Sequence, residues 1–271
     1  MTNPAFEHLD HRHIPALHLD FHAYVHRATS ARHFHFACED RNNAFMVAFP
    51  TLPTDSTGVA HMLEHTTLCG SRRFPVRDPF FMMLRRSLNT FMNAFTSGDS
   101  TAYPFATQNR KDFSNLMAVY LDAVFFPRLD VLDFKQEGWR LDFASSDDDS
   151  ELVFKGVVYN EMKGAMSAPS AQLWQRLQSA IFSDTVYQFN SGGEPANIPD
   201  LSCDQLKAFH VKHYHPTHAI FMTYGSFSVD EHHDQFESSV LSEFAHNADE
   251  ITCALQPRFK APKNIEDCYA V

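Results

Sequence analysis

His61-Met-Leu-Glu-His65 places two imidazoles and one carboxylate within about one helical turn. Residues 61 and 65 are four apart, so on a helix both rings lie on one face, where each can offer a neutral nitrogen to the same zinc ion. Glu64 lies beside them, where its carboxylate can take a proton from an attacking water molecule. The order His-x-x-Glu-His reverses the more familiar zincin pattern and is a peptidase signature. This stretch therefore predicts a helical zinc peptidase site.

The third protein ligand of such a site must come from another segment. A catalytic zinc ion usually has three protein ligands and one water molecule, and the two histidines supply only two of them. Glu161, in a stretch with apolar residues at helical spacing, is the leading candidate, and its competitor is Glu137 in Gln136-Glu-Gly-Trp-Arg140. Spacing alone does not choose between these two glutamates, and a solvated role remains open for either.

The apolar pattern predicts alternating strands and helices. Strands are predicted at 31–38, 44–49, 91–95, 101–105 and 219–224, and the first two are expected to be adjacent, joined by a turn at 39–43. Helices are predicted around 61–65 with an end near Gly70, and at 78–88, 112–126, 154–166, 171–182, 202–213 and 229–245. Residues 145–150 are predicted to form a polar surface loop. Strands mixed with long helices indicate a layered α+β or α/β protein.

Composition limits the class of protein. With 271 residues, 44% of them apolar and 26 of them Phe, the chain can bury the core of one large domain or two small ones. A net charge of −11 argues against a nucleic-acid partner. No apolar run approaches the roughly 20 residues that span a membrane. The first residues lack a secretory apolar region and carry Glu7, Asp10 and Asp20, unlike a mitochondrial transit peptide, so we expect a cytoplasmic location.

The remaining cysteines and histidines are not expected to bind metal. The five cysteines are odd in number and contain no Cys-x-x-Cys pair, so we expect reduced, mostly buried thiols. His33 and His35 alternate with phenylalanines on one face of a strand, and His232 and His233 lie in a polar helical stretch. Each histidine outside the 61–65 turn is expected to have a role other than ligand.

Several longer motifs occur in unbroken order over residues 20–245. They are 59–71 (VAHMLEHTTLCGS), 77–81 (RDPFF), 91–96 (FMNAFT), 120–123 (YLDA), 136–140 (QEGWR), 156–164 (GVVYNEMKG), 191–193 (SGG) and 209–216 (FHVKHYHP). On these motifs the chain resembles the presequence protease branch of the pitrilysin/insulinase zinc metallopeptidases. The resemblance implies an α+β domain with a mixed, largely antiparallel sheet layered with helices.

The resemblance also implies roles for individual residues. In this family the glutamate of Asn-Glu-Met-Lys-Gly is the third zinc ligand, which here is Glu161, and Glu137 then becomes a supporting or helix-packing residue behind the ligands. The Asn93-Ala94 motif lies in the family on an edge strand that pairs with the extended substrate. Without the family, an Asn that satisfies a local turn remains the alternative for Asn93. Phe91 and Phe95 are expected to be core residues.

The resemblance implies a zinc metalloendopeptidase that hydrolyses short, unfolded peptides, often basic ones. Family members are clamshells of two halves with two related domains each, so residues 1–246 are expected to form the N-terminal peptidase domain. Residues 247–271 are expected to be a linker and the truncated start of a second domain, with Cys268-Tyr-Ala-Val271 opening a strand. A C-terminal half or a second chain would complete the chamber. The alternatives are an isolated metal- or peptide-binding domain without turnover and, less favoured, a structural zinc site, which would leave Glu64 without a role.

Overall fold

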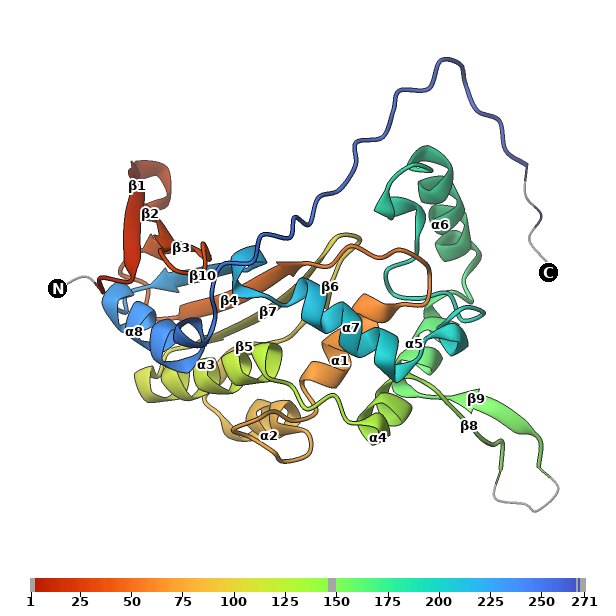
Figure 1. Cartoon of the computed structure of the whole chain (residues 1–271), viewed down its shortest axis with the longest axis horizontal. Helices are drawn as coiled ribbons and strands as arrows, with labels where there is room; N and C mark the ends of the chain where they lie inside the picture. The colour runs from red at the N-terminus through yellow and green to blue at the C-terminus, as the bar shows by residue number, and fades with distance from the viewer. Residues whose placement is uncertain (1–2, 146–149, 267, 269–271) are drawn as a thin grey trace.

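An eight-stranded sheet forms the centre of the computed structural model, which describes residues 3–145, 150–266 and 268 (Figure 1). Its strands run in the order β1-β2-β3-β10-β4-β7-β5, with the short β6 also paired to β7. All pairs are antiparallel except β3 with β10. The strands are β1 (Phe6–Ile14), β2 (Leu19–His26), β3 (Arg32–Ala37), β4 (Asn43–Pro50), β5 (Asn89–Met92), β6 (Phe95–Thr96), β7 (Ser100–Thr107) and β10 (Ile220–Gly225). The predicted α+β class with a mixed, largely antiparallel sheet is confirmed.

Helices cover the sheet and extend beyond its end (Figure 1). They are α1 (Val59–Thr67), α2 (Pro79–Arg86), α3 (Arg110–Phe125), α4 (Val131–Asp133), α5 (Val157–Ala165), α6 (Pro169–Ile181), α7 (Cys203–His213) and α8 (Val229–Ser239). A π-helical turn, Phe134–Gly138, follows α4, and β8 (Arg140–Phe143) pairs with β9 (Leu152–Lys155) in a separate hairpin. Among the described residues no helix combines the length and apolar character needed to cross a membrane.

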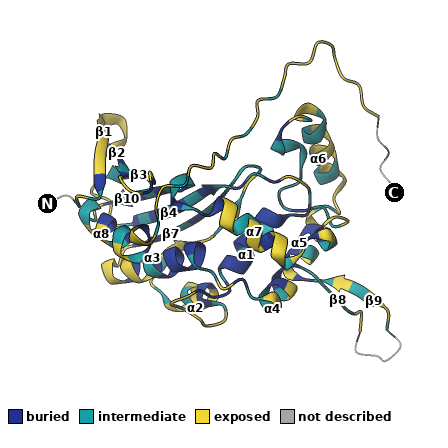
Figure 2. Ribbon diagram, in the orientation of Figure 1, coloured by how far each residue is buried: buried dark blue, intermediate teal, exposed yellow. Residues whose placement is uncertain are grey.

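Aromatic side chains hold α3 and α8 against one face of the sheet. Tyr120 of α3 contacts Phe105 of β7 with ring centroids 5.2 Å apart, and Phe236 of α8 contacts Phe221 of β10 at 4.8 Å. All four side chains are almost fully buried, and the parts of α1 and α3 that face the sheet are dark blue in Figure 2. Such aromatic contacts contribute beyond the area they bury. The core therefore lies between this face of the sheet and its helices.

The predicted adjacency of the strands at 31–38 and 44–49 is wrong. Strand β10 lies between β3 and β4, parallel to the first and antiparallel to the second. A turn-like sequence between two strands reports only local geometry, whereas β10 comes from far along the chain and fills the central position with the buried Phe221 and Thr223. The polar segment 39–43 therefore leads from one strand to the next without forming a hairpin.

Other predicted boundaries need correction. The helix predicted from residue 154 begins only after Gly156, because residues 152–155 form β9 and a Cβ at Gly156 would lie 2.0 Å from the carbonyl oxygen of Gly138. The helix predicted to reach residue 245 ends at Ser239. Strands β1 and β2 were not predicted, since β1 is a mostly exposed edge strand without alternating apolar residues. Ser202 caps α7 through a capping box with Gln205.

The remaining expectations concern the cysteines, the C-terminal tail and the loop at 145–150. The cysteines are free, as expected, but only Cys69 is buried among Cys38, Cys69, Cys203, Cys253 and Cys268, so the expectation of mostly buried thiols is wrong. The described part of the tail, 247–266, contains no helix or strand. Most of the predicted loop at 145–150 and of the strand predicted at 268–271 lies outside the described residues.

Four histidines form a buried cluster between β3 and α8, although the stretch predicted for His232 and His233 was a polar helix. His33 and His233 share a hydrogen bond of 2.9 Å between ring nitrogens. His33 and His35 both contact the Thr223 hydroxyl, at 2.8 and 2.7 Å. Burial lowers the pKa of His35 to about 4 and the pKa values of His232 and His233 to about 3. These imidazoles are therefore neutral in the folded chain near neutral pH.

We expect the free energy of unfolding to decrease as the pH falls below about 6.5. In the unfolded chain His35, His232 and His233 take up protons near that pH, whereas the folded chain keeps them neutral down to about pH 4 or 3. The unfolded state then binds more protons, and each histidine removes about 1.4 kcal/mol per pH unit. This stabilisation is complete above pH ~6.5 and is lost progressively through the folded pKa values.

Urea unfolding at about pH 7.5, 6 and 5 measures how steeply the free energy of unfolding depends on pH. The control is His232→Leu, which removes one titrating ring that makes aromatic contacts with Phe113 and Phe236. Its unfolding free energy should depend less steeply on pH than that of the unmodified chain. An equal slope in both proteins would contradict the assignment to this cluster.

Candidate metal and active site

Helix α1 carries the two histidines on the side that faces away from the core. Met62 and Leu63 are fully buried, whereas His61 and His65 are only partly buried, as the spacing of four predicts. The helix begins after Gly58, whose φ of 72° and close approach to Gly192 favour glycine, since a Cβ there would lie 2.6 Å from the Gly192 oxygen. The loop around Gly192 is thereby held directly against the first turn of α1.

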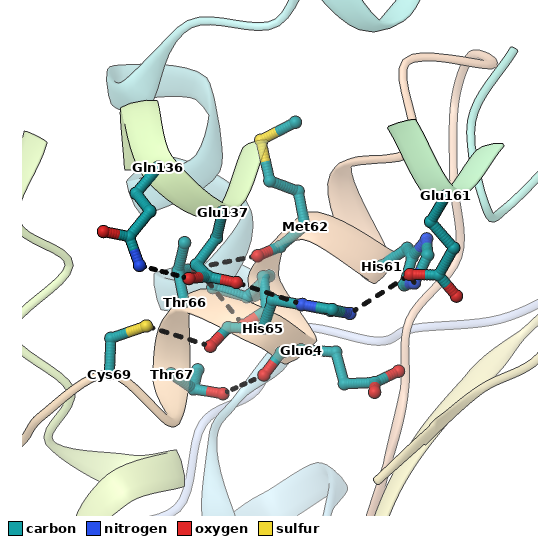
Figure 3. Close-up of polar contacts among 11 residues, drawn as sticks. His61, Met62, Glu64, His65, Thr66, Thr67, Cys69, Gln136, Glu137 and Glu161 are labelled. Carbon is teal, nitrogen blue, oxygen red and sulfur yellow. Dashed lines mark hydrogen bonds and ion pairs between the residues drawn. The ribbon is translucent and has the colours of Figure 1, made fainter. Parts of the chain in front are cut away.

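The structure brings His61, His65 and Glu161 together (Figure 3). The Glu161 Oε2 atom, on α5, lies 3.7 Å from His61 Nε2 and 3.8 Å from His65 Nε2. Ligand atoms of a tetrahedral zinc ion, with bonds near 2.0–2.1 Å, are about 3.3 Å apart. The two distances from Glu161 thus exceed this spacing by only a few tenths of an ångström, and all three ligand atoms lie within 4.8 Å of one another. Glu161 is exposed, so its carboxylate is free to move.

The other ring nitrogen of each histidine is already engaged. His61 Nδ1 donates to the carbonyl oxygen of Gly192 at 3.0 Å, and His65 Nδ1 donates to Glu137 Oε2 at 3.3 Å. Because both partners can only accept, the protons reside on Nδ1 and each Nε2 keeps a lone pair on the side of Glu161. Partners of this kind orient metal-binding imidazoles and raise their basicity. The donor set fits zinc.

Glu137 lies on the opposite side of the His65 ring from Glu161 (Figure 3). It sits in the π-helical turn that packs against α1, and its side chain is 8% exposed. Burial opposes its charge, but hydrogen bonds from His65 and Gln136 outweigh burial and lower the pKa of the carboxyl. For His65, burial opposes protonation, yet Glu137 and the neighbouring glutamates outweigh it and raise the pKa of the imidazole. Glu137 therefore contacts the Nδ1 side of His65 and is not one of the three residues whose ligand atoms converge.

Glu64 is held by a threonine that the sequence analysis missed. Thr96 of β6 donates its hydroxyl hydrogen to Glu64 Oε2 at 2.5 Å. The Thr96 hydroxyl also contacts that of Thr101 at 3.4 Å, and Thr101 contacts Thr51 at 2.8 Å, so a row of hydroxyls leads away from the carboxylate. Thr96 stands next to the 91–95 strand predicted from sequence, but pairing of β6 with β7 is needed to direct its side chain at α1.

Asn93 and Ala94 lie at the edge of the sheet beside Glu64. They connect β5 to β6, and β5 is the last strand of the order. Both residues line a cavity of about 170 Å³ together with Glu64 and His65. The Asn93 side chain accepts a hydrogen bond from the Ala94 amide at 2.9 Å, which is the local role that the sequence left open.

The expectation that Phe91 and Phe95 are core residues is wrong. Their side chains are 45% and 48% exposed, and the two rings stack with centroids 6.3 Å apart. Alternation along β5 and β6 puts Met92 in the core, and the two phenylalanines face outward. The edge next to Glu64 is therefore apolar and accessible.

Comparisons with known proteins identify the relatives of this chain. Residues 53–171 match the model of the insulinase family, peptidase family M16, and residues 200–267 match that of the peptidase M16 inactive domain. The chain is 52% identical to the mitochondrial presequence protease of Xenopus laevis over 251 residues, which is 92% of this chain and 24% of that protein. For the protein of the same name from Danio rerio, identity is 56% over 232 residues, 85% of this chain and 23% of that protein.

The chain thus spans about a quarter of the length of the curated relatives it matches. A crystal structure of a protease from Helicobacter pylori is also similar, with a TM-score of 0.64 and 18% identity, covering 88% of this chain and 53% of that one. At this identity the likeness shows the fold alone, and it agrees with the layered α+β architecture.

The expected cytoplasmic location is contradicted by these relatives, because they are named as mitochondrial. The expectation rested partly on Glu7, Asp10 and Asp20 near the start of the chain. In the structure these residues lie in β1 and β2 of the main sheet. Their charges therefore belong to a folded element and carry no information about targeting.

Proposed function

Because the chain belongs to the presequence protease branch of the insulinase peptidase family, we propose that it is the part of a zinc metalloendopeptidase that carries the metal site. His61, His65 and Glu161 would hold the ion. The observation that carries this proposal is the convergence of the three ligand atoms with both Nδ1 protons directed away from them. When bound, zinc would polarise the scissile carbonyl and make a water molecule a stronger nucleophile.

The remaining steps of the reaction would depend on Glu64, Thr96 and Glu137. Glu64 would accept the proton of the attacking water and pass it to the leaving amine. The Thr96 hydroxyl would hold one carboxylate oxygen, so that the other is free to reach the water. Glu137 would keep the His65 ring oriented through its Nδ1–H. All of these groups are positioned by packing before substrate arrives, which limits reorganisation during the reaction.

We propose that the substrate binds as an extended strand along the edge formed by β5 and β6. Main-chain groups near Asn93 and Ala94 would pair with the peptide and present its bond to Glu64. Recognition through the backbone suits short, unfolded peptides of varied sequence. The exposed Phe91 and Phe95 would add apolar contact without demanding one side chain.

The chain covers only about a quarter of the length of its relatives, and this affects which activity is proposed for it. Residues 1–246 form the proposed peptidase domain, and 247–271 the proposed linker and start of a second domain. We propose that a C-terminal half or a second chain closes the chamber. The competing proposal is a domain that binds metal or peptide without turnover. Both proposals retain the three ligands, so the measurement that separates them is turnover.

A fluorogenic-peptide assay with and without a chelator separates these proposals. Hydrolysis that stops with chelator and returns with added Zn²⁺ supports the peptidase. Zinc binding without chelator-sensitive cleavage supports the binding domain. Supplying the remaining segments of a relative in the same assay tests whether they are needed to complete the chamber.

Thr96→Val is expected to lower kcat roughly ten- to a hundredfold with little change in KM. Valine keeps the shape of threonine but cannot donate to Glu64, so the carboxylate loses its fixed orientation while the substrate edge is preserved. Steady-state kinetics with a peptide substrate measures the effect. Thr96→Ser, which restores the hydroxyl, should recover most of the loss. Wild-type kcat in the valine variant would refute a positioning role.

A further inference from the structure

A second group of possible ligands lies just beyond the C-terminal end of α1, near His65. One ligand atom from each of Cys69, Asp78 and Glu137 lies within 4.8 Å of the other two. The residues come from three segments, namely the turn that follows α1, the residue that precedes α2 and the π-helical turn. Cys69 lies two positions after the last residue of α1, and its thiol donates to the carbonyl oxygen of His65 at 3.4 Å. The three groups are thus brought together by tertiary packing.

The environment of this group is enclosed on most sides. Cys69 and Glu137 are 7% and 6% exposed, whereas the Asp78 side chain is 33% exposed. Cys69 and Glu137 also line the cavity of about 170 Å³ beside Glu64. A space of this size holds an ion with one or more water molecules. Asp78 pairs with Arg77 at 3.5 Å and lines a neighbouring surface pocket, so it approaches the other two groups from the solvent side.

Negative charge predominates around the thiol. Burial, followed by the charges of Glu137, Asp133 and Asp78, raises the pKa of Cys69, and Arg77 only partly opposes them. Burial and neighbouring carboxylates also raise the pKa of Asp133. A divalent cation would neutralise this potential and replace the thiol proton. One thiolate with two carboxylates is a donor set suited to Zn²⁺ or Cd²⁺ and poorly suited to Mg²⁺.

We propose that Cys69, Asp78 and Glu137 form a second site for a thiophilic divalent cation, distinct from the site at His61, His65 and Glu161. On binding, the Cys69 proton passes to solvent and a metal–sulfur bond forms. This site goes beyond the proposed function and does not require it. One consequence does rest on that function. Glu137 would be drawn from the His65 Nδ1–H toward the second ion, so excess cation would inhibit hydrolysis.

Titration of the full chain with Cd²⁺ tests the site without any activity measurement. The unmodified chain should show a thiolate-to-Cd²⁺ charge-transfer absorbance that saturates at one such ion. Cys69→Ser should lose this absorbance, and Cys38→Ser should retain it. His61→Ala should keep the absorbance while equilibrium dialysis shows loss of the other ion. That last variant separates failure of this site from failure of the proposed peptidase site.

A second variant guards against a folding defect in Cys69→Ser. Asp78→Asn leaves the thiol in place and affects a partly exposed side chain, so it should weaken Cd²⁺ binding at least tenfold with unchanged thermal unfolding. The proposal is overturned if the absorbance is missing in the unmodified chain or persists in Cys69→Ser. Unchanged affinity in a folded Asp78→Asn would equally overturn the three-residue site.

Discussion

Glu64→Gln is expected to reduce peptide hydrolysis by about 10²–10⁴-fold while the chain still binds its metal. Glutamine has nearly the shape of glutamate and can accept the Thr96 hydrogen bond through its amide oxygen, so the local packing is preserved. It cannot take a proton from the attacking water. The loss should therefore appear in kcat, with the KM for a peptide substrate changed much less.

Metal content and turnover must be measured on the same Glu64→Gln sample. Equilibrium dialysis should give the same zinc content for this variant and the unmodified chain, because Glu64 is not among the three ligands. Substantial turnover by the zinc-loaded variant would show that another group accepts the proton. Loss of zinc in this variant would instead place Glu64 among the ligands, contrary to the geometry.

His61→Ala and Glu161→Ala are each expected to lose the metal itself. Removing one of three ligands should weaken zinc binding by more than the 10–100-fold that loss of an outer partner costs. Glu137→Gln provides that comparison, since Glu137 contacts only the Nδ1 side of His65. Competition with a fluorescent chelator measures all three affinities on one scale.

The control for Glu161→Ala is Glu39→Ala, which removes an exposed carboxylate from the loop between β3 and β4. Zinc affinity should be unchanged in the control and lost in Glu161→Ala. Equal affinities in both variants would eliminate Glu161 as a ligand. The proposed site would then need a different third residue, with Glu137 the next candidate because it contacts His65.

The local part of the site was predictable because it lies in one helical turn. His61, Glu64 and His65 are close in any helix of this sequence, and the structure places them on α1 as expected. Glu161 is different, because its approach to the histidines depends on how α5 packs against α1. Residue chemistry made Glu161 the leading candidate with Glu137 as its competitor, and the family resemblance strengthened the choice of Glu161. The structure separates them by placing each on its own side of the His65 ring.

Contacts between segments that are far apart in the sequence could not be predicted. Thr96 reaches Glu64 because β6 pairs with β7, and Gly192 reaches His61 because Gly58 allows close approach of two loops. Thr96 and Gly192 lie within the motifs 91–96 and 191–193, but those motifs do not indicate which residues they contact. The same limitation explains the error at β3 and β4, where β10 enters from a distant part of the chain. Periodicity identifies elements and their faces, but it does not identify their neighbours.

The two proposed cation sites share Glu137, which makes this residue informative. In the first site it orients His65 from behind, and in the second it would be a ligand. A chain saturated at the first site alone should be most active, whereas excess ion should occupy Cys69 and Asp78 as well. Inhibition by excess ion that disappears in a folded Cys69→Ser variant would connect the two sites.

Crystallographic detection of zinc in the chain tests the central claim most directly. An anomalous difference map at the zinc absorption edge, from crystals grown with about one equivalent of Zn²⁺, shows the ion and its ligands together. We expect a peak within bonding distance of His61 Nε2, His65 Nε2 and a Glu161 carboxylate oxygen, at about 2.0–2.2 Å from each. A chain that binds zinc with no peak at these three atoms would contradict the account.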